Sequence, residues 1–161
     1  MILRSSTVAL EPITPDLARR IVAREERPGD RWHAEYPFLD EIDPLRSLAA
    51  SAAPDPDFTM YVVRRSSDGM AVGGFGFFGP PDADGRVEFG YGLVPSARGE
   101  GLASSAVLLA LEHARLRGAT TAAADTEADN IASRRVLTKS SLAEVGRNGS
   151  LVLYEGVLTA R

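Results

Sequence analysis

Residues 97–103 read Ala-Arg-Gly-Glu-Gly-Leu-Ala, and they place Gly99 and Gly101 just before a long run rich in alanine and leucine. Glycine costs stability at a helix start, so its presence indicates a need for exposed backbone. The first N–H groups of a helix lack partners within the helix and carry partial positive charge, and glycines let an anion approach them closely. The stretch therefore predicts an anion site, to which Arg98 would add a charged contact.

Periodicity and turn residues predict a mixed α/β or α+β fold around this stretch, with a meander of three strands before it. A helix from Leu102 to about Arg117 follows it, stopped by Gly118. The other expected elements are strands at 6–13, 58–65, 71–79, 86–94 and 119–125, helices at 16–26, 44–52 and 130–140, and a hairpin over 142–158 that turns at Asn148-Gly149.

Length and composition narrow the class of protein. The 161 residues fit a single domain, and 44% hydrophobic with 25% charged residues is typical of a soluble chain. A net charge of -4 argues against nucleic acid or an anionic membrane as partner. The chain has no cysteine, which excludes disulfides, thiol nucleophiles and cysteine-bound zinc. No apolar run approaches the roughly 20 residues of a membrane span, so we expect a cytoplasmic protein without a metal.

Three phosphate-binding designs compete for the glycine stretch. A P-loop needs a Lys after its last glycine, and none is present. A dinucleotide fold needs its glycines directly after a strand, whereas Pro95 intervenes here and Ser104 holds the third glycine position. An oxidoreductase domain, with Asp125 recruited to a ribose, stays open as a weaker alternative. The third design is the pyrophosphate loop of acyl-coenzyme A transferases.

The sequence over residues 86–107 and 125–137 resembles the GNAT superfamily of N-acetyltransferases, in particular its Rim-type branch. Residues Arg98, Gly99, Gly101 and Ala103 fit that branch's loop, and Asn130, Ser133, Val136 and Leu137 fit its later helix motif. The chain departs from the family at Ser141-Leu142, where a glycine and an aromatic residue are usual. The resemblance implies a mostly antiparallel, twisted sheet flanked by helices, with two strands splayed at a cofactor slot, and a family that often dimerises.

The resemblance also implies an activity and its site. The chain would transfer an acetyl group from acetyl-CoA to a primary amine by direct attack, without a metal. The cofactor would bind Leu93 and Val94 by their backbone, the loop from Arg98 through Gly99, Glu100, Gly101 and Leu102 to Ala103, and Asn130. Ser133 would support the leaving thiolate and Glu88 would act as base. A non-catalytic acyl-CoA sensor on the same fold is the alternative.

Several of these residues have simpler roles open to them. Asn130 could serve solely as the N-cap of its helix, Ser133 could be a solvated helix residue, and Glu88 could be a surface charge. Gly90 and Gly92 indicate a bulge or a close ligand approach in their strand, or are merely tolerated under bulky neighbours. We expect His33 and His113 to be structural or exposed residues and not catalytic ones. The aromatic residues Trp32, Tyr36 and Phe38 could line an acceptor pocket or the core, and Tyr154 could donate a proton.

An acidic segment precedes the meander, and the resemblance places it over the acceptor end of the slot. Its members are Asp30, Glu35, Asp40, Glu41 and Asp43, opposed by Arg27, Arg31 and Arg46. An acidic rim would attract a cationic amine. We therefore expect a small cationic amine or a peptide α-amine as acceptor, unless these carboxylates only solvate a loop.

Overall fold

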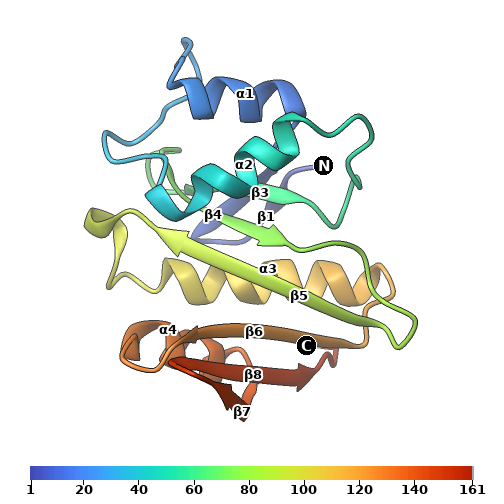
Figure 1. The fold of residues 1–161 in the computed structure, drawn as a ribbon. Helices are drawn as coiled ribbons and strands as arrows, with labels where there is room; N and C mark the ends of the chain where they lie inside the picture. Colours follow the sequence, from blue (N-terminus) through green and yellow to red (C-terminus); the bar gives the residue numbers. More distant parts are fainter. Residues whose placement is uncertain (161) are drawn as a thin grey trace.

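A computed structural model describes residues 1–160 and contains one eight-stranded sheet with the strand order β1-β2-β3-β4-β5-β6-β8-β7 (Figure 1). Antiparallel pairs join β1 through β5, a parallel pair joins β5 to β6, and antiparallel pairs join β6 to β8 and β8 to β7. The strands are β1 (Leu3–Arg4), β2 (Val8–Pro12), β3 (Met60–Arg65), β4 (Ala71–Phe77), β5 (Arg86–Leu93), β6 (Thr121–Glu127), β7 (Ala143–Asn148) and β8 (Leu151–Val157). The expected mostly antiparallel sheet is confirmed, with β1 as a short strand that the sequence reading left out.

Helices α1 (Pro15–Ala23) and α2 (Ile42–Ala49) pack together, and the 3₁₀ turn η1 (Leu39–Glu41) leads into α2. The Thr14 hydroxyl accepts the N–H of Leu17, as expected of an N-cap before a proline. The helix α1 ends earlier than the sequence predicted, because Arg24 takes a left-handed conformation with φ +57°. Its N–H then bonds carbonyls of the last turn, so the chain leaves the helix before Pro28-Gly29.

Helix α3 (Leu102–Leu116) starts where the sequence predicted and packs against β1, β2 and β5 (Figure 1). Its buried face includes Ala106, Val107, Ala110 and Ala114, which recur at the spacing of one helix face. Small side chains let the helix lie close to the sheet. None of the helices in residues 1–160 is long and apolar enough to cross a membrane.

Helix α4 (Ile131–Lys139) and the closing hairpin complete the fold. The hairpin exists as expected, but its turn lies one residue later than predicted. Asn148 is still paired with Leu151 in the ladder, so Gly149 and Ser150 form the turn. Gly149 has φ +61°, which suits a glycine at the first turn position and leaves Asn148 in the extended strand.

Candidate active site

The parallel strands β5 and β6 separate after three residue pairs. Their pairing runs from Arg86 opposite Thr121 to Glu88 opposite Ala123, yet β5 continues to Leu93 and β6 to Glu127. Figure 1 shows the two strands diverging towards the end of β5. The central sheet therefore opens there, as the resemblance implied.

The end of β5 turns free backbone groups towards this opening. Val94 donates its N–H to the Val72 carbonyl, 2.8 Å away, on the β4 side of the strand. Because hydrogen-bonded pairs alternate along an antiparallel ladder, Gly92 also faces β4, and Tyr91 and Leu93 direct their N–H groups to the opposite edge. Val94 is fully buried, and its carbonyl accepts the Ala97 N–H, so neither of its backbone groups is free for a ligand.

The loop between β5 and α3 presents a run of unpartnered backbone donors. Gly99 and Gly101 have φ +85° and +79°, a conformation that side chains disfavour, and nothing lies within 4 Å of where their Cβ atoms would be. Within residues 1–160, the N–H groups of residues 99–104 have no protein acceptor. The 3₁₀ turn η2 (Pro95–Ala97) separates these glycines from the strand, which a dinucleotide loop does not allow. The geometry can hold an anion such as a pyrophosphate.

Two charged side chains flank this loop. Arg98 donates its Nε–H to the Leu93 carbonyl at 3.1 Å, and its guanidinium lies 5.3 Å from the centre of the Phe38 ring. Its terminal nitrogens have no acceptor among the described residues, so they can still reach an anion. The Glu100 carboxylate lies 3.6 Å from the Arg65 guanidinium, so an ion pair partly offsets its negative charge beside the loop.

Across the opening, helix α4 presents Ser133 to Tyr91. The Tyr91 hydroxyl lies 2.9 Å from the Ser133 hydroxyl and also donates to the Ser133 carbonyl at 3.2 Å. Asn130 caps the helix by accepting the Ser133 N–H at 3.1 Å, and its side-chain N–H₂ group has no acceptor among residues 1–160. Burial raises the pKa of Tyr91 to about 12, so this phenol remains a hydrogen-bond donor at neutral pH.

Tyr91 is the site residue that sequence reasoning missed. Its ring stacks on Phe89, with centroids 6.2 Å apart, and Phe89 in turn stacks on Phe75. The only signal in the sequence was a tyrosine between two glycines in residues 90–92. Tyr154 instead accepts the Nε–H of Arg134 at 3.1 Å and is buried in the closing hairpin.

The structure does not bring Glu88 to this site. Its side chain is exposed and pairs with Arg86, where β5 and β6 still run together. It lies three positions before Tyr91, which is about 10 Å along a strand. We therefore do not retain Glu88 as the base.

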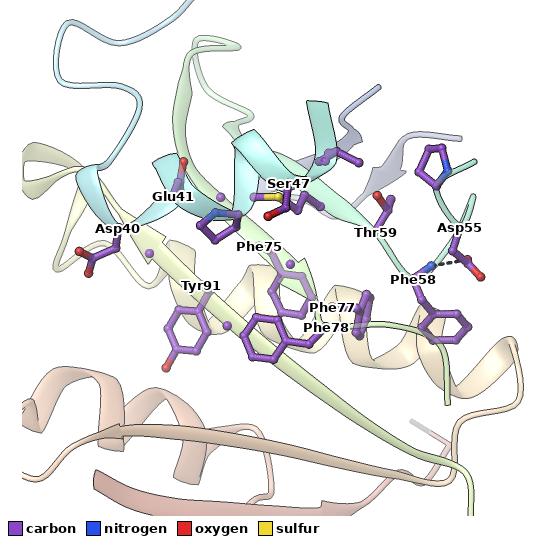
Figure 2. A pocket seen from close by; sticks show the side chains of 18 of the residues that line it. Asp40, Glu41, Ser47, Asp55, Phe58, Thr59, Phe75, Phe77, Phe78 and Tyr91 are labelled. Carbon is purple, nitrogen blue, oxygen red and sulfur yellow. Dashed lines mark hydrogen bonds between the residues drawn. The ribbon is translucent and has the colours of Figure 1, made fainter. Parts of the chain in front are cut away.

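A cavity of about 580 Å³ lies on the other side of β5, between the sheet and the segment of η1 and α2 (Figure 2). Its floor carries two cross-strand glycine pairs, Gly74 with Gly92 and Gly76 with Gly90. Four glycines on one face of two neighbouring strands leave a hollow that ordinary side chains would fill. The walls are mainly apolar and include Phe38, Phe58, Met60, Phe77, Phe78 and Tyr91.

The glycines in β5 mark this cavity and not a bulge. The ladder between β4 and β5 keeps its register from Gly73 opposite Leu93 to Phe77 opposite Phe89. A Cβ on Gly92 would lie 3.0 Å from a Phe38 ring carbon, and one on Gly90 would lie 3.1 Å from Phe78. Of the alternatives that the sequence left open, a bulge is absent from this ladder, and the two glycines lie under the aromatic rings of Phe38 and Phe78.

Only part of the acidic segment lies at the cavity, where the sequence predicted an acidic rim. The Asp30 carboxylate lies 2.6 Å from Arg20, and Glu35 accepts the Ser96 N–H at 3.1 Å. Glu41 is buried, with 9% of its surface exposed, and its carboxylate lines the cavity. Asp40 is exposed and also lines the cavity, Asp43 is exposed but does not line it, and Asp55, from outside this segment, lines the cavity as well. Folding has distributed five neighbouring carboxylates among separate environments.

The remaining candidates divide between the cavity and the core. Phe38 lines the cavity, whereas Trp32 and Tyr36 are buried with ring centroids 6.0 Å apart. His113 is buried with its Nε2 2.9 Å from Asp57, and His33 accepts the Glu35 N–H through Nδ1. Both histidines therefore have structural partners.

The arrangement is similar to that of solved acetyltransferases. RimL, described as a ribosomal L7/L12 alpha-N-protein acetyltransferase and solved with coenzyme A, gives a TM-score of 0.73 at 16% identity over 98% of both chains. A spermidine N-acetyltransferase SpeG chimera from Vibrio cholerae and hSSAT gives 0.70 at 16% identity over 95% of this chain and 96% of that one. A ribosomal-protein-S5-alanine acetyltransferase from Vibrio fischeri gives 0.67 at 14% identity over 98% and 97%. At these identities the likeness is one of fold, and it confirms the predicted fold type.

The amino-acid sequence itself matches a family model. No curated protein sequence matches it significantly. The model of the acetyltransferase (GNAT) domain matches residues 8–142. Because that match covers most of the chain, the protein belongs to the GNAT acetyltransferase family.

Proposed function

We propose that residues 1–161 act as one acetyltransferase domain, which transfers an acetyl group from acetyl-CoA to a primary amine by direct attack. One observation carries this proposal. The opening between β5 and β6 joins the unpartnered N–H groups of residues 99–104 to the free N–H groups of Tyr91 and Leu93 and to the Ser133 hydroxyl. An anion loop, an extended strand edge and a hydroxyl are the groups that a pyrophosphate, a pantetheine arm and a thiolate need.

The proposed roles follow the opening from the loop inwards. Backbone donors from Gly99 to Ala103 hold the pyrophosphate, with Arg98 adding charge. The edge of β5 pairs with the pantetheine amides, and the side-chain N–H₂ group of Asn130 is free to join it while its oxygen caps α4. Val94 has no part in this scheme, because both of its backbone groups are used within the protein.

The chemical step needs a donor for the oxyanion and a group that supports the leaving thiolate. The Leu93 N–H points into the opening and serves as the oxyanion donor. Ser133 donates its hydroxyl proton to the thiolate as the carbon–sulfur bond breaks, and Tyr91 holds Ser133 in place. The acceptor amine enters from the glycine-floored cavity on the other side of β5. RimL and SpeG, by their descriptions, act on a protein α-amine and on spermidine, both of which carry primary amines.

The test combines binding with a screen of acceptors. Calorimetry should show binding of acetyl-CoA in preference to NAD, and thiol detection should show coenzyme A release with some members of a panel of primary amines. Gly101→Asp places bulk and negative charge in the loop, whereas Gly101→Ala adds the backbone strain alone at φ +79°. We expect the Asp variant to bind acetyl-CoA at least about tenfold more weakly than the Ala variant. Equal affinity in the two variants would contradict the loop assignment, and binding without turnover would indicate a sensor.

A further inference from the structure

Glu41 is a buried carboxylate for which the described part of the chain supplies no hydrogen-bond partner. Its Oε1 atom is inaccessible to solvent and unpartnered, and the side chain lines the cavity. Burying a charged or polar group without a partner costs several kcal/mol in general, so such a group needs an explanation. The fold even makes room for it, because a Cβ on Gly74 would collide with this carboxylate.

The position of Glu41 relates it to the reaction centre. Gly74, on which the carboxylate lies, is paired across the ladder with Gly92. Gly92 stands between Tyr91 and Leu93, whose N–H groups face the opening. The carboxylate therefore lies over the same short stretch of sheet as the proposed oxyanion donor, one strand away and on the cavity side (Figure 2).

The groups around Glu41 leave its charge uncompensated. Asp40, its neighbour on η1, adds negative charge, and the Tyr36 hydroxyl is buried and also lacks a partner. Arg64 on β3, which acts electrostatically on Tyr36, is engaged by Glu11 at 2.9 Å and by two carbonyls. Burial, with a contribution from Asp40, raises the pKa of Glu41 to about 8. What this carboxylate lacks is a cationic or donating group.

The rest of the cavity indicates what such a group would be attached to. Aromatic and aliphatic side chains form most of the wall, whereas the polar side chains, which include Asp40, Asp55 and Thr59, form a smaller part of it. Most of a bound ligand's surface would therefore meet apolar groups and lose hydration. An amine with an apolar body would satisfy both the wall and the carboxylate.

We propose that Glu41 binds the amino group of the acceptor and takes its proton, and that the acceptor is a primary amine carrying an apolar or aromatic side group. This inference rests on the proposed acetyl transfer. The ammonium gives one proton to the Glu41 carboxylate, and the freed lone pair forms the carbon–nitrogen bond. The carbon–sulfur bond breaks, and Ser133 gives its hydroxyl proton to the thiolate. The second nitrogen proton, lost as the amide forms, restores the Ser133 hydroxyl. Glu41 then returns its proton to solvent.

The test uses Glu41→Gln, which keeps the shape of the side chain and removes its charge. Asp43→Asn is the matched control, because Asp43 is an exposed acid two residues away and does not line this cavity. Both variants and the wild type are assayed with acetyl-CoA and either 2-phenylethylamine or ethylenediamine between pH 6 and pH 9. Thermal unfolding checks that each variant is folded.

We expect kcat/KM of the wild type to be higher for 2-phenylethylamine than for ethylenediamine, and to rise with pH up to about 8 as Glu41 ionises. Glu41→Gln should lower kcat/KM by about 100-fold or more and lose this ionisation from its pH profile, with acetyl-CoA affinity unchanged. Asp43→Asn should behave as the wild type. Because the amine's own ionisation is common to all three proteins, it cancels when their profiles are compared.

Three outcomes would overturn the proposal: an unchanged kcat/KM in Glu41→Gln, the same ionisation in its pH profile, or a preference for ethylenediamine. A wild type that fails to bind acetyl-CoA would instead defeat the proposed function. In that case calorimetry with 2-phenylethylamine alone decides the role of Glu41. Weaker binding to Glu41→Gln than to the wild type supports it, and equal binding or none to either refutes it.

Discussion

The burial of Glu41 predicts that its replacement by glutamine stabilises the protein in a pH-dependent way. The folded-state pKa of about 8 lies above the ordinary value of 4.5, so the folded state holds the proton more tightly than the unfolded state does. The wild type is therefore favoured at low pH, where Glu41 is protonated in both states. It loses stability as the pH rises from about 4.5 to about 8.

The size of this effect follows from the shift in pKa. Each pH unit within the window costs about 1.4 kcal/mol of unfolding free energy, because the unfolded state binds fewer protons than the folded state. Between pH 4.5 and neutrality the wild type should lose about 3 kcal/mol relative to a variant that does not titrate at this position. Above pH 8 the loss should level off at about 5 kcal/mol.

Denaturant unfolding of the wild type and Glu41→Gln at several pH values from about 5 to about 8.5 measures the effect. In the difference in unfolding free energy between the two proteins, the contributions of all other titrating groups cancel. Since only Glu41 remains, this difference should grow with pH in favour of the variant. Asp43→Asn, at an exposed position, should show a difference that does not change with pH. A difference between Glu41→Gln and the wild type that stays constant over this range would refute a buried, uncompensated Glu41.

Further predictions concern the two sides of β5. Ser133→Ala should lower kcat by about 10- to 1000-fold and leave acetyl-CoA affinity unchanged, whereas an unaltered kcat in steady-state assays would return Ser133 to a plain helix role. Tyr91→Phe removes the hydroxyl 2.9 Å from Ser133, so kcat should fall in the same direction but less, and a larger fall than in Ser133→Ala would contradict a positioning role. Gly92→Ala places a Cβ 3.0 Å from the Phe38 ring, which should raise KM for the amine while calorimetry shows unchanged acetyl-CoA binding; the reverse pattern would put the cavity on the cofactor side.

Local signals in the sequence were sufficient to predict the elements next to the opening between β5 and β6. The start of α3 at Leu102, after two glycines with positive φ, and the Asn130 cap of α4 were both predicted. A cap or a helix start depends on a few consecutive residues, so the pattern contains the information. The position of a hairpin turn depends on more than such local signals. The hairpin turn moved to Gly149-Ser150 because cross-strand register, and not the Asn-Gly pair alone, sets which residues turn.

The sequence by itself therefore determined the family, and it predicted the exposed glycine loop before α3 and the position of Ser133 on α4. Tertiary structure alone decided which side chains meet at β5. The two glycine pairs form a cavity floor only because β4 and β5 align Gly74 with Gly92 and Gly76 with Gly90. Glu41 is buried, unlike its exposed neighbours Asp40 and Asp43, because η1 packs on Gly74, which follows it by over 30 residues in the chain. Register and burial arise from contacts between distant segments, and a residue's neighbours in sequence do not encode them.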